Sequence, residues 1–389
     1  MRFRRDSRII SFSLRVLILI LHAHVLLFTC THPATAADLP NGVSQNLVLA
    51  PGPNNPRNSE GDFAVLGDGR VLFVYTRFTG GTGDADAAEL VSRLSTDGGR
   101  TWSARDELVV ARPAGAQNIM SVSILPLRDG RLAMFYLEKK SAGDCRAVMR
   151  VSTDGAKSWS EPRECMPEAG YFVVNNGRAI QLADGRIILP AARHDAAADK
   201  PGWHRGVAVC FFSDDGGLTW HRSDSALEAP PQSRSGLQEP LVAELKDGRL
   251  LMLCRTDQGF LFRSYSQDRG QTWSAPEPSD LASPLSPASL KRIPKTGDLL
   301  LVWNDHTAID AAHRGKRTPL TVAISNDEGK TWTHRKTLYD DPQGWYCYCA
   351  IAFVGERVLL GHCAGLQTKM SSGLTTTVVT SFGVDWLYR

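Results

Sequence analysis

The sequence contains the octet Ser95-Thr96-Asp97-Gly98-Gly99-Arg100-Thr101-Trp102, and four further copies of its pattern, S-x-D-x-G-x-T-W, follow it. The later copies occupy residues 152–159, 213–220, 266–273 and 325–332, with Ala156 and Ser158 as the two departures from the pattern. Their aspartates, Asp97, Asp154, Asp215, Asp268 and Asp327, are therefore 57, 61, 53 and 59 residues apart. This period is too long for a helical repeat and suits a four-stranded sheet with long loops. The octet itself predicts a hairpin turn, in which the aspartate caps backbone N–H groups, glycine supplies a positive φ and the tryptophan begins the next strand.

A second turn is repeated upstream of each octet. Residues 63–74 consist of an apolar strand, the turn Gly67-Asp68-Gly69-Arg70 and a second apolar strand. The same D-G-R turn recurs at Asp129, Asp184 and Asp247, with looser versions at Gly297-Asp298 and Gly355-Glu356. Each repeat therefore contains four strands, A to D, with the D-G-R turn between A and B and the octet turn between C and D. The sixth repeat ends in the strand 375–382 without an octet.

Six four-stranded antiparallel sheets of this kind predict an all-β fold, a six-bladed β-propeller formed by residues 37–389 as a single domain. Roughly 350 residues divided among six blades gives about 58 residues per blade, which agrees with the observed period. A seven-bladed ring is the alternative. The stretch 43–50 either completes the sixth blade or begins an extra one.

The composition excludes several classes of protein. The chain has 389 residues, of which 42% are hydrophobic and 22% charged, and this balance excludes disordered, collagen-like and multispan membrane proteins. The formal charge is +3, but residues 1–36 hold five arginines and one aspartate. The remainder therefore carries 3 − 4 = −1, and we expect no nucleic-acid partner.

Residues 1–36 have the three regions of a secretory signal peptide. An arginine-rich start precedes the apolar run 16–28, and Ala34-Thr35-Ala36 supplies a small-residue cleavage site. We therefore expect an exported protein, secreted or periplasmic, that begins near Ala37 and has no membrane span in its mature part. A membrane anchor is the alternative, although the apolar run is shorter than the ~20 residues that cross a bilayer.

Seven cysteines follow Cys30, so at least one thiol cannot pair within the mature chain. Cys145 and Cys165, close in sequence, are the pair that we favour for a disulfide. Cys347 and Cys349 form a lone C-x-C with no second matching pair, which favours two positions along one strand over a metal site. We expect no metal, no cofactor and a monomer.

The direction of the strands predicts where a site can form. Both repeated turns lie on one face of the ring, so the loops before strand A, after strand B and before strand C emerge on the other face. The polar residues on that face are Arg57, Glu60, Arg77, Asp84, Asp86, Asn118, Asn175, Asn176, Arg178, Glu239, Arg255, Arg317, Tyr346 and Tyr348. Arginines directed at one cavity need an anionic partner, and a ligand with a carboxylate would supply it. If the anomeric carbon itself carries that carboxylate, a neutral tyrosine activated by a glutamate is a better nucleophile than an anion.

The five octets resemble the Asp-box (BNR) repeats of the sialidase superfamily, and the order of the polar residues resembles the order of that family's site residues. The resemblance covers essentially the whole mature chain. It implies that Arg57, Arg255 and Arg317 bind the substrate carboxylate. It also implies that Tyr348 attacks C2, that Glu239 takes the tyrosine proton and that Asp84 is the acid/base. Arg77, Asn118 and Asn176 are further candidate substrate-binding residues on the same face.

The chain departs from the family pattern at its first arginine. The family has an R-I-P segment there, whereas this chain has Pro56-Arg57-Asn58-Ser59-Glu60, and Glu60 can replace the acidic partner that the family supplies from the following strand. Asp86 competes with Asp84 and Tyr346 with Tyr348. We prefer Tyr348 because it leads directly into strand A of the sixth repeat.

The resemblance implies an exo-α-sialidase that releases terminal α-linked sialic acid from glycans with retention, through a tyrosyl-enzyme intermediate. A glycosidase that acts on another carboxylated sugar, with Asp84 and Glu239 as paired carboxylates, is one alternative. A non-catalytic propeller that binds acidic glycans is the other, because Asp-box repeats also occur in proteins without hydrolase activity.

Overall fold

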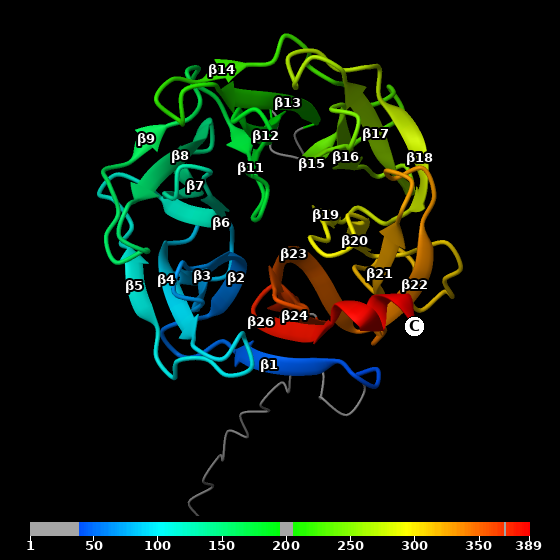
Figure 1. Ribbon diagram of the computed structural model, residues 1–389, viewed down its shortest axis with the longest axis horizontal. Helices are drawn as coiled ribbons and strands as arrows, with labels where there is room; N and C mark the ends of the chain where they lie inside the picture. Colours follow the sequence, from blue (N-terminus) through cyan, green and yellow to red (C-terminus); the bar gives the residue numbers. More distant parts are fainter. Residues whose placement is uncertain (1–38, 195–204, 369–370) are drawn as a thin grey trace, which may run out of the picture. The chain divides into compact units, whose positions relative to one another are not determined.

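The computed structural model describes residues 39–194, 205–368 and 371–389, and these residues form six antiparallel sheets arranged as the blades of a propeller (Figure 1). Blade one contains β2 (Arg57–Val65), β3 (Val71–Phe78), β4 (Ala88–Ser95) and β5 (Glu107–Val110). Blade two contains β6 (Asn118–Pro126), β7 (Leu132–Ser141), β8 (Asp144–Ser152) and β9 (Arg163–Glu164). Blade three contains β10 (Phe172–Val173), β11 (Ile180–Gln181), β12 (Ile187–His194), β13 (Gly206–Ser213) and β14 (His221–Arg222).

The second half of the ring repeats this arrangement. Blade four contains β15 (Gln238–Glu244), β16 (Leu250–Arg255), β17 (Phe260–Ser266) and β18 (Glu277–Ala282). Blade five contains β19 (Ser289–Arg292), β20 (Leu299–Trp303), β21 (Leu320–Ser325) and β22 (Thr333–Tyr339). Blade six contains β23 (Gly344–Val354), β24 (Arg357–Thr368), β26 (Thr377–Gly383) and the small strand β25 (Ser371–Ser372). A short 3-10 helix, η2 (Val384–Tyr388), follows β26.

The outer strand of blade six comes from the other end of the chain. β1 (Ser44–Leu49) pairs with β26, from Ser44 opposite Ser381 to Leu49 opposite Thr377. The ring is thus closed by pairing an early strand with a late one. The stretch 43–50 completes the sixth blade, so the six-bladed prediction is confirmed and the seven-bladed alternative is wrong.

The two repeated turns have the predicted structure. In the first octet, the Asp97 carboxylate accepts hydrogen bonds from the backbone N–H groups of Arg100 and Thr101 and from the Thr101 hydroxyl. Gly98 and Gly99 adopt φ values of 72° and 83°. In the D-G-R turn, Gly69 N–H donates to the carbonyl of Leu66, and Asp68 accepts from the N–H of Arg70.

The prediction that each octet tryptophan begins the outer strand is only partly correct. The fourth strand begins immediately after Trp220 in blade three and after Trp332 in blade five. In blades one, two and four it begins four or five residues after the tryptophan. Pro162 and Pro276 stand in two of these gaps, and a proline cannot donate a backbone hydrogen bond to a sheet.

The apolar side chains form six buried clusters among the described residues, each centred between two neighbouring blades. The cluster between blades two and three also includes Phe78 and Ala88 of blade one. Alternation along a strand explains this arrangement, because successive side chains point to opposite faces of the sheet. Phe63 and Phe73 pack against blade six, for example, whereas Ala64 and Val74 pack against blade two. The core therefore surrounds the axis as a ring and leaves the inner ends of the first strands free to carry polar groups.

The favoured disulfide between Cys145 and Cys165 is not formed. All seven cysteines of the described residues are free and buried. Cys145 and Cys165 both belong to the apolar cluster between blades two and three, where each packs as a small hydrophobic side chain. The predicted signal peptide, residues 1–36, lies outside the described residues. Within residues 39–194, 205–368 and 371–389 no helix is long and apolar enough to cross a membrane.

Candidate functional site

The innermost strands of four blades each contain a β-bulge with an unusual backbone conformation. The strand register shifts between Ser59 and Asp62, Met120 and Ser123, Gln238 and Leu241, and Cys347 and Ala350. Inside each bulge one non-glycine residue has a positive φ: Glu60 (55°), Ser121 (63°), Glu239 (46°) and Tyr348 (58°). Such a conformation is costly for these residue types, and bulges with this geometry redirect side chains near functional sites.

The four bulge residues converge on one place, since all of them line a recess of about 60 Å³. Three of them, together with Asn176 of blade three, occupy the same position in their repeats. Each stands eight residues before the aspartate of its own D-G-R turn: Glu60 before Asp68, Ser121 before Asp129, Asn176 before Asp184 and Glu239 before Asp247. This spacing is the sequence signal that would have identified Ser121, which our sequence analysis missed.

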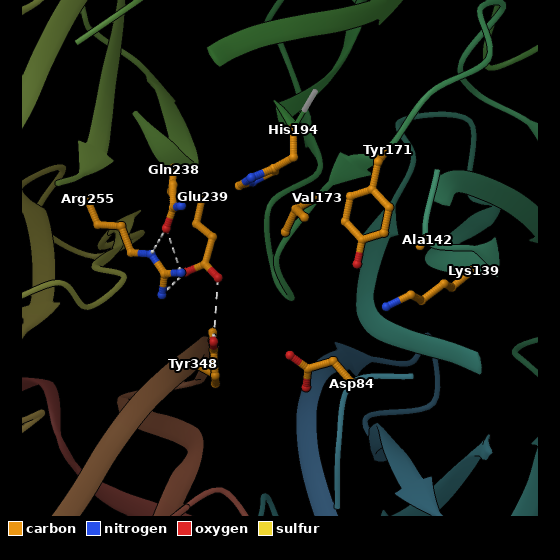
Figure 2. A pocket seen from close by; sticks show the side chains of 10 residues that line it. All are labelled: Asp84, Lys139, Ala142, Tyr171, Val173, His194, Gln238, Glu239, Arg255 and Tyr348. Atoms are coloured by element: carbon orange, nitrogen blue, oxygen red, sulfur yellow. Dashed lines mark hydrogen bonds and ion pairs between the residues drawn. The ribbon is translucent and has the colours of Figure 1, made fainter. Parts of the chain in front are cut away.

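A larger cavity of about 470 Å³ lies beside the recess (Figure 2). Its lining comes from blades one, two, three, four and six: Asp84, Lys139, Ala142, Tyr171, Val173, His194, Gln238, Glu239, Arg255 and Tyr348. Four of these residues, Asp84, Glu239, Arg255 and Tyr348, were predicted site residues. They are separated by up to 264 positions in the sequence, from Asp84 to Tyr348, and the ring brings them to one cavity.

Tyr348 and Glu239 face each other across this cavity. The Tyr348 hydroxyl donates a hydrogen bond to Glu239 Oε1 at 3.5 Å, and Arg255 Nη1 lies 2.8 Å from Glu239 Oε2. Gln238 Oε1 accepts from Nε and Nη2 of Arg255 at 3.2 and 2.9 Å and so fixes the guanidinium (Figure 2). Burial, followed by the charge of Glu239, raises the pKa of Tyr348 above its ordinary value. A phenol in this state is neutral and needs a base to attack.

The backbone of Tyr348 is held from the opposite side of the ring. Asn176 Nδ2 donates to the carbonyl of Tyr348 at 2.9 Å and to the carbonyl of Gly61 at 2.8 Å. One amide group therefore joins two of the bulges across the axis. Asn176 was a predicted substrate-binding residue, but its amide nitrogen is occupied by these two carbonyls, and the side chain is buried.

Arg57 lies beneath Asp84 with 1% of its surface exposed. Its Nη1 donates to Asp84 Oδ1 at 2.6 Å, and its Nη2 donates to Glu60 Oε1 at 3.0 Å. Glu60 also accepts a hydrogen bond from the hydroxyl of Ser121. The acidic partner that we expected for Arg57 is thus Glu60, and Asp84 is a second one.

Arg317 packs against the nucleophile candidate. Its guanidinium lies 5.1 Å from the centre of the Tyr348 ring and 5.4 Å from that of Trp345, and Nη1 donates to the sulfur of Cys347 at 3.2 Å. Among the described residues no carboxylate forms an ion pair with Arg317, and its Nε has no hydrogen-bond partner. Arg178, which also precedes strand A of its blade, reaches blade five, where it donates to the carbonyl of Ala288 and to the hydroxyl of Ser289.

Four other residues named by the sequence analysis lie away from the cavity. Arg77 forms ion pairs with Glu89 and Asp106 towards the outer part of blade one. Asn118 donates to the carbonyl of Asp86, and Asp86 accepts from the N–H of Gly83, so both shape the loop that carries Asp84. Tyr346 stacks on Tyr339 in the cluster between blades five and six. Arg77 and Asn118 are therefore not brought to the cavity, and of each competing pair it is Asp84 and Tyr348 that line it.

Blades two and three supply a wall of the cavity that was not predicted from the sequence. Lys139 lies with its ammonium 5.1 Å from the centre of the Tyr171 ring, and Tyr171 meets His194 edge to face at 6.3 Å. Figure 2 shows Lys139 and Tyr171 on the opposite side of the cavity from Arg255, with His194 between Tyr171 and Glu239. Lys139 lies near the end of β7, the first strand of the β7–β8 hairpin, at the end of the strand that is near the site face. This position is the feature of the sequence from which Lys139 could have been predicted as a site residue.

Known proteins share this sequence pattern and this fold. The family model described as "BNR repeat-like domain" matches residues 75–359, which is more than half of the chain. The chain belongs to the sialidase superfamily with BNR repeats. Among curated relatives, a sialidase of Bacteroides fragilis is 27% identical over 319 residues, which cover 72% of this chain and 55% of the relative. A sialidase of Micromonospora viridifaciens is 26% identical over 361 residues, 79% of this chain and 53% of the relative. This member of the superfamily thus spans about half the length of the curated relatives that it matches.

Solved structures agree on the fold. A Hadza microbial sialidase, Hz136, superposes with a TM-score of 0.69 at 19% identity, covering 85% of this chain and 66% of the other. A Dyadobacter fermentans protein of unknown function has the same TM-score at 20% identity and covers 88% of this chain and 100% of the other. At these identities the similarity shows that this superfamily member shares the propeller fold of the two structures, and it shows nothing about activity.

Proposed function

We propose that this propeller is an exo-acting glycoside hydrolase that releases terminal α-linked sialic acid from glycans with retention of configuration. The observation that carries the proposal is the hydrogen bond from the Tyr348 hydroxyl to Glu239 in a cavity that Arg255 and Asp84 also line. A binding protein has no need for a phenol paired with a buried carboxylate. The curated relatives named as sialidases support the same assignment.

In the first step, Tyr348 Oη attacks the anomeric carbon C2 of the sugar while Glu239 takes the phenol proton. The bond from C2 to the leaving oxygen breaks, and Asp84 donates a proton to that oxygen. The neutral tyrosine is suited to this attack because C2 bears a carboxylate that would repel an anionic nucleophile. The raised pKa of Tyr348 makes the transfer of its proton to Glu239 part of the step.

In the second step, Asp84 takes a proton from water, and the water oxygen attacks C2 on the face from which the first leaving group departed. The bond from C2 to Tyr348 Oη breaks, and Glu239 returns the proton to the tyrosine. Two displacements at one carbon give net retention. The sugar carboxylate meets Arg255 and Arg317, which flank Tyr348.

A hydrolase of another acidic sugar is the second candidate, and two observations favour it. Arg57, which the resemblance assigns to the carboxylate, is already paired with two carboxylates. Lys139 faces the cavity, and no ion pair joins it to an acid among the described residues, so this wall can receive an anionic group that the arginines do not bind.

The test is release of 4-methylumbelliferone from its α-sialoside by the purified protein, with Tyr348→Phe as the variant. We expect turnover in the wild type and its loss in the variant, because the phenyl ring lacks the attacking oxygen. Binding of free sialic acid to the variant, measured by calorimetry, is expected to persist.

Tyr346→Phe is the matched control, since Tyr346 is a buried tyrosine two residues away that does not line the cavity. It is expected to keep turnover. Loss in Tyr346→Phe with normal activity in Tyr348→Phe would reverse the assignment. A folded wild type that binds sialic acid without turnover would identify a binding propeller, and turnover of a different acidic glycoside alone would identify the second candidate.

A further inference from the structure

The guanidinium of Arg57 has almost no capacity left for a ligand. Four hydrogen bonds occupy it: Nε donates to Ser59 Oγ at 3.0 Å, Nη1 to the carbonyl of Thr82 at 3.0 Å and to Asp84 at 2.6 Å, and Nη2 to Glu60 at 3.0 Å. A guanidinium has five N–H donors in total. One face of the group also lies 4.3 Å from the centre of the Phe78 ring.

The other two arginines differ from Arg57 in this respect. Arg255 pairs with one carboxylate, that of Glu239, and Arg317 pairs with none among the described residues. Arg57 is paired with two, Glu60 and Asp84, and it is the least exposed of the three. A bidentate contact with a substrate carboxylate requires two adjacent N–H groups, and Arg57 has only one N–H group without a partner.

Asp84 needs external support to act as an acid. Its side chain is 63% exposed and stands in the loop 79–87, which contains three glycines. An exposed side chain on a glycine-rich loop samples many conformations, whereas a general acid must lie within hydrogen-bond reach of the leaving oxygen. Asn118 and Asp86 hold other parts of this loop, but it is Arg57 that holds the Asp84 carboxylate itself, together with the carbonyl of Thr82.

We propose that Arg57 is a positioning residue for the acid Asp84, held in place by Glu60, and that Arg255 and Arg317 bind the substrate carboxylate without it. This inference rests on the proposed function and assigns Arg57 a different task from the one that the family resemblance implies. Glu60 has a defined part in it. Its Oε1 accepts a hydrogen bond from Arg57 Nη2, and its Oε2 accepts one from the hydroxyl of Ser121. Glu60 thus anchors the guanidinium on the buried side while Nη1 of Arg57 is directed at Asp84.

The chemistry of the leaving group distinguishes the two tasks. An acid catalyst matters for a sugar leaving group, whose oxygen must be protonated, and matters little for 4-nitrophenolate, which leaves without a proton. A carboxylate-binding arginine stabilises the sugar in either case. In the first step, which kcat/KM reports, loss of positioning therefore affects only the substrate with the poor leaving group, while loss of carboxylate binding lowers kcat/KM for both substrates by the same factor.

The experiment compares kcat and KM on 3′-sialyllactose and on 4-nitrophenyl α-sialoside. Arg57→Lys and Glu60→Gln are expected to lower kcat/KM on sialyllactose ~10²-fold, with most of the loss in kcat, and to change kcat/KM on the nitrophenyl sialoside less than ~10-fold. Asp84→Asn is the reference for a lost acid and should give the same pattern. Arg255→Lys is the reference for a lost carboxylate ligand and should reduce both substrates equally through KM.

A double variant separates positioning from a general structural effect. If Arg57 acts through Asp84, then Arg57→Lys combined with Asp84→Asn is no slower on sialyllactose than Asp84→Asn alone, because the group being positioned is already absent. Equal losses on both substrates, a rise in KM with the nitrophenyl sialoside, or additive losses in the double variant would each overturn the proposal. If Arg57→Lys does not fold, the Glu60→Gln and Glu60→Gln/Asp84→Asn pair answers the same question.

Failure of the proposed function has a different signature. In that case the wild type itself turns over neither sialoside. Turnover by the wild type with equal losses in the Arg57 variant would leave the proposed function standing and return Arg57 to the carboxylate-binding set.

Discussion

The fold buries the carboxyl group of Glu60, and the effect of this burial on the free energy of unfolding depends on pH. Burial raises its pKa from 4.5 to about 7, while Arg57 acts in the opposite direction. Between these values the folded chain holds a proton that the unfolded chain has released, so the free energy of unfolding falls as the pH rises through this window. Asp62, whose pKa burial raises to about 6, acts in the same direction. Burial lowers the pKa of His362 from 6.5 to about 4. Between these values the unfolded chain binds a proton that the folded chain does not, so this group makes the free energy of unfolding rise with pH.

At the scale of this residue we predict that Glu60→Gln flattens the dependence of stability on pH. The thermal unfolding midpoint of the wild type, relative to that of the variant, is expected to fall from about pH 5 to about pH 7.5, because only the wild type must release the Glu60 proton. Asp62 and His362 are present in both proteins and cancel in the comparison. Glu356→Gln, at an exposed glutamate in a turn, is the matched control and should follow the wild type. Parallel curves for Glu60→Gln and the wild type would show that no such proton is linked to folding.

At the scale of elements, turns were predictable and bulges were not. The D-G-R and octet turns are encoded by residues that themselves make the turn, such as Asp97 and Gly99, so each copy can be identified without its neighbours. The positive φ of Glu239 or Tyr348 has no such local cause, because neither residue type favours it. It is stabilised by contacts from other blades, for example the bond from Asn176 to the carbonyl of Tyr348, 172 positions away. The sequence therefore located these residues but not the direction of their side chains.

The bulge of blade one supplies a direct test of this point. A Cβ on Gly61 would lie 2.6 Å from Phe73 Cζ and 2.6 Å from the backbone oxygen of Val74, so Gly61→Ala must displace the bulge. We expect a loss of ~1–3 kcal/mol in the free energy of unfolding, measured by urea denaturation, with a parallel loss of sialosidase turnover as Glu60 moves. Gly67→Ala is the control, since a Cβ there meets nothing within 4 Å. It is expected to change stability by less than ~0.5 kcal/mol. A Gly61 variant with wild-type stability and turnover would mean that the bulge tolerates the methyl group and does not set the site.

At the scale of the whole molecule, the number of blades could be predicted because it follows from a period that five octets repeat. The membership of the site could be predicted only in part. Strand direction assigned fourteen polar residues to one face, yet Arg77 and Tyr346 on that face pair with Asp106 and Tyr339 instead of the cavity. Such choices depend on partners from other segments, and no local pattern records them. The same holds for the wall formed by Lys139 and Tyr171.

Closure of the ring is the property of the whole molecule that can be removed in one step. β1 is the outer strand of blade six, and the bond from Ser381 Oγ to Asn46 Oδ1, at 2.6 Å, and the buried Leu49 attach it to the blade that carries Tyr348. A chain that begins at residue 51 lacks this strand and exposes the hydrogen-bonding edge of β26. Compared with a chain that begins at residue 39, we expect a lower denaturation midpoint and concentration-dependent association by size-exclusion chromatography. The shorter chain should also lose turnover at a lower temperature than the longer one, because Tyr348 lies in β23 of the sheet that β1 completes. Equal midpoints for the two chains would mean that the inter-blade clusters hold the ring closed without β1.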